Sequence, residues 1–184
     1  YRGQVHYSIM IKKLCEFNRR TEFILTVLKN TLDSGGDDRQ IMIIAHNKNV
    51  LKYLYDAIDN RKIGTVGYYI GGMKEKDLKE SESKQVIIAT YAMAEEALDI
   101  KTLTTLLMAT PKTDVRQAVG RILRQKHKQA LVIDIVDQHD IFQRQWTKRR
   151  RYYNKKQYNI VCADMVNYKK NKWEDISKKK KFKS

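Results

Sequence analysis

Residues 41–45, IMIIA, decide the fold of this chain. The run is too short for a helix and is rich in branched apolar residues. It therefore predicts a strand that is buried on both faces, as in a parallel sheet. Asn47 follows closely and suits the N-cap of a helix. The apolar stripe of that helix contains Val50, Leu51, Leu54 and Ile58.

The same strand-and-helix unit recurs along the chain. Further strands are predicted at residues 65–70, 85–90, 104–110 and 130–136. A long basic helix is predicted at residues 138–158. We also expect residues 1–33 to be helical, with Asn18 as a cap, ahead of a turn-rich loop at 33–40. Five short strands alternating with helices predict an α/β fold, in which a doubly wound, mainly parallel sheet has helices on both faces. Such sheets bind ligands at the carboxyl ends of their strands.

The positive charge is concentrated at the C-terminal end of the 184 residues. The net charge is +16, and residues 141–184 hold 15 Lys and Arg against 3 Asp and Glu, a net charge of +12 that leaves +4 for the first 140 residues. A globular body with a basic end is typical of a polyanion-binding protein, and a solvated tail is the alternative. We expect a sheet domain at 1–137, a basic helix packed on it at 138–160, and a flexible Lys-rich tail at 161–184.

Residues 116–124, RQAVGRILR, carry the pattern that points to chemistry. On a helix, Gln117, Gly120, Arg121 and Arg124 fall on one stripe, and the opposite face is apolar. A glycine inside a helix costs roughly 1 kcal/mol relative to alanine, so Gly120 indicates that something approaches this stripe closely. Two arginines next to a glycine could bind a phosphate, because a planar guanidinium group can donate two parallel hydrogen bonds to phosphate oxygens. A solvated charged face is the alternative.

The start of that helix is also predicted from the residues before it. Thr113 follows the only proline of the chain by two positions and can cap the helix. Asp114 suits the positive end of the helix dipole.

The four residues Gln117, Gly120, Arg121 and Arg124 match Q-x-x-G-R-x-x-R, which resembles motif VI of the superfamily 2 helicases. In that family the motif lies on the second of two RecA-like domains and faces ATP held by the first. The resemblance implies that Arg121 and Arg124 are catalytic arginine fingers, which stabilise charge on the transferring phosphoryl group and typically contribute about 10³ to 10⁵ in rate. It implies that Gln117 and Gly120 belong to the nucleotide site.

Residues 87–100, IIATYAMAEEALDI, resemble motif V of the same family. The resemblance implies that Thr90 contacts the nucleic-acid backbone and that Asp99 reaches the ATP ribose or the partner domain. An ordinary helix cap is the alternative for Thr90. Ala97 stands where the family usually has glycine. We expect the neighbouring acids, Glu95 and Glu96, to pair with arginines across the domain interface.

Residues 41–54 resemble motif IV, which implies that His46 and Asn47 approach the nucleic-acid strand. Between motifs IV and V, Gly71 and Gly72 follow a predicted strand and bring backbone N–H groups within reach of a phosphate, with Lys74 close by. A plain turn is the alternative for the two glycines.

The basic helix after residue 137 has two stripes. The first contains Phe142, Trp146, Arg149 and Tyr153, and the second contains Arg144, Lys148, Arg151 and Lys155. An aromatic stripe usually packs on the core, whereas the cationic side can follow phosphates. Arg149 and Arg150 are the candidate phosphate contacts here. We expect Asp134 and Asp137, at the end of the last strand, to orient nearby arginines.

No metal site or membrane span is predicted. Cys15 and Cys162 are far apart, and the four histidines lack metal-ligand spacing. No apolar run has the length of a membrane span.

The sequence contains neither G-x-x-x-x-G-K-[ST] nor D-E-x-[DH], so the phosphate cradle and the Mg²⁺-holding acid are absent from it. We therefore expect the second motor domain of an ATP-dependent helicase, a fragment without Met at its start that does not hydrolyse ATP alone. ATP and Mg²⁺ would be held mainly by a separate N-terminal RecA-like domain.

Within the superfamily, the sequence resembles the helicases of large cytoplasmic DNA viruses. That resemblance implies a role in viral transcription, partners among the transcription machinery, and a place in the host cytoplasm or the virion. The substrate would be a single- or double-stranded nucleic acid, DNA or RNA. Two alternatives remain: a non-catalytic basic module that binds nucleic acid or protein, and a duplex translocase that separates no strands.

Overall fold

The computed structural model describes residues 6–36, 38–96, 100–122 and 130–177. Its main sheet has the strands β1 (Ile41–Ala45), β2 (Val66–Tyr69), β3 (Val86–Thr90), β4 (Thr105–Met108) and β5 (Leu131–Asp134). The strand order is β2-β3-β1-β4-β5, and every neighbouring pair is parallel. The predicted doubly wound parallel sheet is confirmed.

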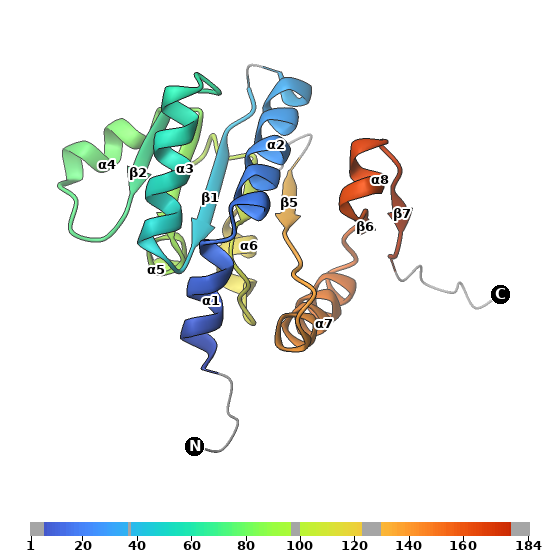
Figure 1. Cartoon of the computed structure of the whole chain (residues 1–184). Helices are drawn as coiled ribbons and strands as arrows, with labels where there is room; N and C mark the ends of the chain where they lie inside the picture. The colour runs from blue at the N-terminus through green and yellow to red at the C-terminus, as the bar shows by residue number, and fades with distance from the viewer. Residues whose placement is uncertain (1–5, 37, 97–99, 123–129, 178–184) are drawn as a thin grey trace.

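Helices cover both faces of this sheet (Figure 1). They are α1 (Tyr7–Cys15), α2 (Asn18–Gly35), α3 (Lys48–Asn60), α4 (Glu75–Glu82), α5 (Tyr91–Glu96), α6 (Arg116–Ile122) and α7 (Asp140–Lys155). Because side chains alternate along a strand, Ile41 and Ile43 pack with α2 and α3, whereas Met42 and Ile44 pack with α5, α6 and α7. All five residues of β1 are fully buried, which explains why this strand reads as a continuous apolar run.

Two helix starts test the predicted caps. Asn47 caps α3, and its side chain accepts a hydrogen bond from the backbone N–H of Asn49 at 2.7 Å. Asn18 does not cap α2, because the helix begins one residue earlier than predicted. The carbonyl of Phe17 already accepts the first helical hydrogen bond, from the backbone N–H of Arg20 at 3.0 Å.

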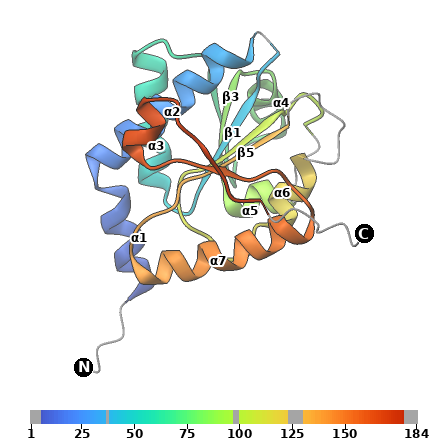
Figure 2. The ribbon, with the colours of Figure 1, turned by 90° about the vertical axis from the view of Figure 1, so that its right-hand side faces the viewer.

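The C-terminal part differs from the predicted flexible tail. After α7 the chain forms β6 (Val161–Cys162), α8 (Met165–Lys169) and β7 (Glu174–Asp175), with β6 and β7 paired antiparallel. Tyr168 of α8 packs edge-on against Phe23 at 5.3 Å and accepts a hydrogen bond from Asn30 at 3.2 Å. Ile160 and Ile176 pack on the opposite core, so this segment passes the β5 side of the sheet (Figure 2). These apolar anchors explain why the expectation was wrong for residues 161–177.

Helix α7 lies beside the carboxyl end of β5 (Figures 1 and 2). Its buried side chains are Phe142, Arg149 and Tyr153, which confirms the predicted core-facing stripe. No helix in the described part of the chain is long and apolar enough to cross a membrane.

Candidate nucleotide and nucleic-acid interface

The carboxyl ends of β1, β3 and β4 bring three predicted segments together. Ala45 is in register with Thr90, so His46 lies beside Tyr91, with ring centroids 4.5 Å apart. The backbone N–H of His46 donates to the hydroxyl of Thr110 at 3.0 Å. The motif IV-like, motif V-like and pre-α6 segments therefore share one edge of the sheet.

The loop between β4 and α6 is held by side chains from four different helices. Four consecutive carbonyl groups of this loop each accept a hydrogen bond. The donors are Arg20 to Ala109 at 2.7 Å, Tyr91 to Thr110 at 2.6 Å, Tyr7 to Pro111 at 2.9 Å and Arg149 to Lys112 at 2.6 Å. We call these four donors the loop clamp. Because buried carbonyls without partners are costly, the clamp fixes the backbone that leads into α6.

Two arginines of the clamp are themselves fixed by carboxylates. Arg149 makes two hydrogen bonds to Asp134, at 2.7 and 2.8 Å, and Arg20 makes two to Asp137, at 2.6 and 2.8 Å. Both guanidiniums are buried. The prediction that the two aspartates orient arginines is confirmed.

The prediction that Arg149 contacts phosphate is wrong. Its side chain is only 1% exposed, and its guanidinium is occupied by Asp134 and the carbonyl of Lys112. Sequence reasoning placed it correctly on the apolar stripe but could not locate its partner. The neighbouring Arg150 is half-buried and donates to the carbonyl of Ile176 at 3.1 Å.

Helix α6 buries its apolar face and leaves Gln117 exposed. Val115, Ala118 and Val119 are buried, whereas Gln117 is exposed. A Cβ built on Gly120 would meet no described atom within 4 Å outside the local helix, so packing in the described chain does not explain this glycine. Arg121 lies in α6, and both Arg124 and Asp99 lie outside the described residues.

The start of α6 is organised by Asp114. Its carboxylate accepts a hydrogen bond from the backbone N–H of Arg116 at 3.0 Å and pairs with the side chain of the same arginine. These contacts with Arg116 lower the pKa of Asp114 to about 2. Thr113 is exposed, so the aspartate rather than the threonine supplies the described cap.

Thr90 caps helix α5, which was the alternative to a contact with the nucleic-acid backbone. Its hydroxyl oxygen lies 3.4 Å from the backbone N–H of Met93, in the first turn of α5. The hydroxyl is half-buried at the same edge as His46, so its hydrogen remains available for a ligand.

The two acids of the motif V-like segment were expected to face another domain. Glu95 instead pairs with Lys112, whose ammonium also lies 4.7 Å from the ring centre of Tyr91. The expectation was wrong for Glu95 because the loop clamp brings Lys112 beside α5. The side chain of Glu96 lies outside the described part.

His46 occupies an environment that disfavours its charged form. Burial and the nearby ammonium of Lys112 lower the pKa of its imidazole, and a contact of 3.2 Å with the carbonyl oxygen of Pro111 opposes them. Near neutral pH His46 is therefore uncharged. It is suited to hydrogen bonding rather than to an ion pair with phosphate.

The glycine pair lies at the opposite side of the sheet from the loop clamp. Gly71 and Gly72 form an exposed turn after β2, and Gly72 has a φ of 88°, which favours glycine. Lys74 is exposed at the N-cap position of α4. The strand order separates β2 from β4 by two strands, so this turn is distant from the loop clamp. Strand β2 nevertheless pairs directly with β3, which ends at Thr90.

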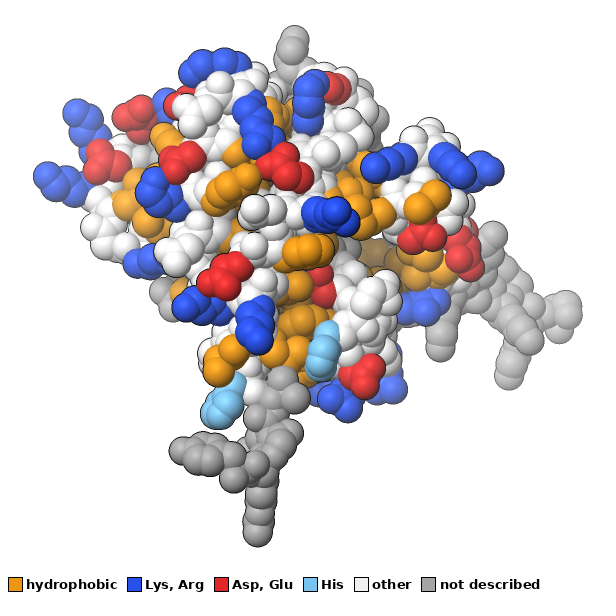
Figure 3. Space-filling view, in the orientation of Figure 1, with side chains coloured by type: hydrophobic (Ala, Val, Ile, Leu, Met, Phe, Trp, Pro, Cys, Tyr) orange, Lys and Arg blue, Asp and Glu red, His pale blue; other side chains and the backbone are white. Residues whose placement is uncertain are grey.

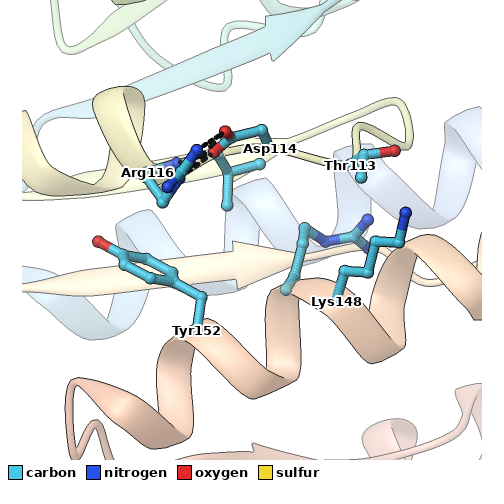
Figure 4. Close-up of a pocket in the computed structure, with 7 residues that line it drawn as sticks. Thr113, Asp114, Arg116, Lys148 and Tyr152 are labelled. Carbon is cyan, nitrogen blue, oxygen red and sulfur yellow. Dashed lines mark hydrogen bonds and ion pairs between the residues drawn. The ribbon is translucent and has the colours of Figure 1, made fainter.

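A shallow hollow lies between the start of α6 and α7. Tyr152 and Lys148 project from α7 toward the loop that carries Thr113, Asp114 and Arg116 (Figure 4). Within the described ranges, no three His, Cys, Asp or Glu residues form a group that could hold a metal ion.

The chain is similar in sequence to proteins of large viruses. No protein-family model matches the chain. It is 39% identical over 176 residues to a protein of Acanthamoeba polyphaga mimivirus that is named as an ATP-dependent RNA helicase, a match covering 91% of the chain and 33% of that protein. A similarly named protein of African swine fever virus is 29% identical over 130 residues, which is 65% of the chain and 26% of that protein. The chain spans about a third or less of these relatives.

Solved structures agree on the fold. T4 UvsW matches 85% of the chain with a TM-score of 0.66 and 21% identity, over 36% of its own length. The C-terminal domain of the DEAD-box protein Dbp5 matches 64% of the chain with a TM-score of 0.50 and 15% identity, over 69% of that domain. The chain therefore has the fold of the RecA-like domains of helicases. Its relatives include proteins of large viruses that are named as helicases.

Three donors of the loop clamp were missed by sequence reasoning. Tyr7, Arg20 and Tyr91 reach carbonyls that lie 104, 89 and 19 positions away along the chain. Their sequence surroundings are those of ordinary helix residues. Arg20 and Asp137 are 117 positions apart, and only the folded sheet brings them together.

Proposed function

We propose that the whole protein is an ATP-dependent nucleic-acid helicase and that this domain supplies arginine fingers to ATP bound by a separate N-terminal RecA-like domain. Arg121 and Arg124 would stabilise the charge of the transferring phosphoryl group. Gln117, Gly120 and Asp99 would contact the nucleotide or the facing domain. This domain alone would not hydrolyse ATP, because its sequence has no phosphate cradle.

The observation that carries the proposal is the loop clamp. It fixes the backbone before α6, while α6 leaves Gln117 exposed and Gly120 open. An arginine finger must be held in place before the reaction begins, because a charge that is already in position stabilises the transition state. A helix that starts from a fixed loop and leaves Gln117 exposed and Gly120 open meets this requirement.

The nucleic-acid strand would lie along the other loops of the same edge. The hydroxyl of Thr90, neutral His46 and Asn47 offer polar groups to a backbone, and the exposed turn at Gly71 and Gly72 offers backbone N–H groups with Lys74 nearby. Contacts of this kind bind the backbone and do not choose between DNA and RNA.

The whole protein would require ATP and Mg²⁺, held mainly by its N-terminal domain. Since the relatives are proteins of large viruses, we also propose a role in viral transcription, in the host cytoplasm or the virion. The alternative function is a non-catalytic basic module, and the dense positive charge of α7 favours it.

The test measures ATP hydrolysis and strand displacement by the full-length protein with single-stranded RNA, single-stranded DNA and partial duplexes. Stimulated hydrolysis with displacement supports the helicase. Stimulated hydrolysis on duplex without displacement indicates a translocase instead. Strand binding without any hydrolysis would contradict the proposal and leave the binding module.

A further inference from the structure

One face of α7 carries cations that have no ion-pair partner in the described part of the chain. Arg144, Lys148, Arg151 and Lys155 are all exposed and follow one another at intervals of four, three and four residues, so they form one stripe of the helix. We call them the cationic stripe. Each ion pair found among the described residues joins other side chains.

Several exposed lysines elsewhere in the domain are paired with acids. Lys29, Lys52 and Lys79 each pair with an acid four residues away, at 2.7, 2.7 and 2.8 Å. Lys62 pairs with an acid three residues before it, at 3.5 Å. Over α3 and α4, side chains of both signs are accordingly interspersed (Figure 3). The cationic stripe, by contrast, places four exposed cations without an ion pair to any described residue along one face of a single helix.

The stripe has an electrostatic cost that the described part of the domain does not offset. Like charges three or four residues apart destabilise a helix. The sole acid of α7 is Asp140 in its first turn, and the buried Asp134 is taken up by Arg149. A bound polyanion would remove the repulsion by supplying negative charge along the whole stripe.

The stripe is also fixed in orientation. The opposite side of α7 is anchored by the buried Phe142, Arg149 and Tyr153, so the helix cannot turn its cations inward. Lys148 projects beside the hollow that Tyr152 and the pair of Asp114 and Arg116 line (Figure 4). Arg149 of α7 hydrogen-bonds Asp134 at the end of β5 and the carbonyl of Lys112 after β4, so α7 lies beside the edge that carries the motif-like loops.

We propose that the cationic stripe of α7 binds the phosphate backbone of a nucleic-acid strand, as a site separate from the motif-like loops. The inference rests on the proposed function, in that the strand is the one on which the motor acts. At 1.5 Å per residue the stripe is about 16 Å long, so its four cations can contact successive phosphates of one strand. The lysines contact phosphate as point charges, and the arginines contact it through the planar guanidinium group. Such contacts do not read the bases, so binding at this site should not depend on the sequence of the nucleic acid.

The test compares two variants of the full-length protein, each of which loses four positive charges. The stripe variant carries Arg144→Gln, Lys148→Gln, Arg151→Gln and Lys155→Gln. The control variant carries Lys29→Gln, Lys52→Gln, Lys62→Gln and Lys79→Gln. Binding of a labelled single strand is measured from low to high salt without ATP, and circular dichroism checks that both variants fold.

In the stripe variant we expect affinity at low salt to fall at least tenfold. The slope of log affinity against log salt should decrease in magnitude by about 0.7 for each phosphate that is no longer neutralised. The control variant should keep affinity within about threefold. Equal losses in the two variants would mean a general charge effect, and an unchanged stripe variant would mean a different occupant; either result overturns the proposal. Since the assay needs no ATP, its outcome is independent of whether the protein proves to be a helicase.

Discussion

Arg149 and Asp134 form a buried ion pair with two hydrogen bonds, 2.7 and 2.8 Å long, that joins α7 to the end of β5. The same guanidinium donates to the carbonyl of Lys112, at 2.6 Å, in the loop that leads into α6. One arginine therefore connects the last strand of the main sheet, helix α7 and the predicted finger helix. The pair explains why a basic residue lies on the apolar stripe of α7.

Arg149→Leu should lower the free energy of unfolding by about 3–5 kcal/mol, because it leaves the carboxylate of Asp134 buried without its partner. Arg151→Leu, two positions along the same helix but exposed, should change it by about 0.5 kcal/mol or less. Denaturant unfolding followed by tryptophan fluorescence compares the two. Similar values for both variants would argue against a structural role for the pair.

Tyr91→Phe removes one donor of the loop clamp. The phenol of Tyr91 is buried and donates to the carbonyl of Thr110 at 2.6 Å, so its loss should cost about 1–3 kcal/mol. Tyr53→Phe is the matched control, since that phenol is exposed and bonds Glu22 at the surface. Thermal unfolding should show a larger loss of stability in Tyr91→Phe than in Tyr53→Phe. An equal loss of stability in the two variants would contradict the stabilising role of the loop clamp.

Gly120→Ala should raise the stability of the domain and lower the ATP hydrolysis of the full-length protein. Since nothing described lies within 4 Å of the added methyl group, the helix should gain roughly 0.5–1 kcal/mol of stability. In the full-length protein the same methyl group should slow ATP hydrolysis, because it would occupy the space that the facing domain needs. Unfolding and turnover are measured on the same preparation. A stabilised variant with full turnover would show that nothing approaches Gly120.

His46 should make stability depend on pH. Its pKa in the folded state lies below the ordinary 6.5, so the unfolded state binds more protons and stability falls as the pH drops below about 6.5. His46→Gln should flatten this decline between pH 7.5 and 5.5. The two proteins are compared by denaturant unfolding across that range, and parallel curves would exclude the histidine as the source.

Much of the fold could be predicted because it depends on local patterns. The five strands are short apolar runs, and the buried stripe of α7 follows from the spacing of Phe142, Arg149 and Tyr153. The anchors of residues 161–177 were missed because Tyr168 is a single aromatic side chain in a lysine-rich segment, and its partner Phe23 belongs to a distant helix.

The candidate site was predictable only in part. The motif pattern identified α6 and its polar stripe, and the two aspartates after β5 were correctly expected to orient arginines. The supporting contacts depend on which strands are neighbours, and that is a property of the sheet order rather than of any segment. Lys112 therefore pairs with Glu95, and Arg149 is a support rather than a phosphate contact.

The central proposal is that α6 and the residues after it supply arginine fingers. Its most direct test measures nucleic-acid-stimulated ATP hydrolysis by the full-length protein and its Arg124→Ala variant, with strand binding measured in parallel. The control is Arg116→Ala, which removes an exposed arginine of the same region that pairs locally with Asp114. The account predicts that Arg124→Ala lowers turnover by about 10³-fold or more while strand binding is retained. Turnover that stays unchanged in Arg124→Ala, or that falls equally in Arg116→Ala, would contradict it.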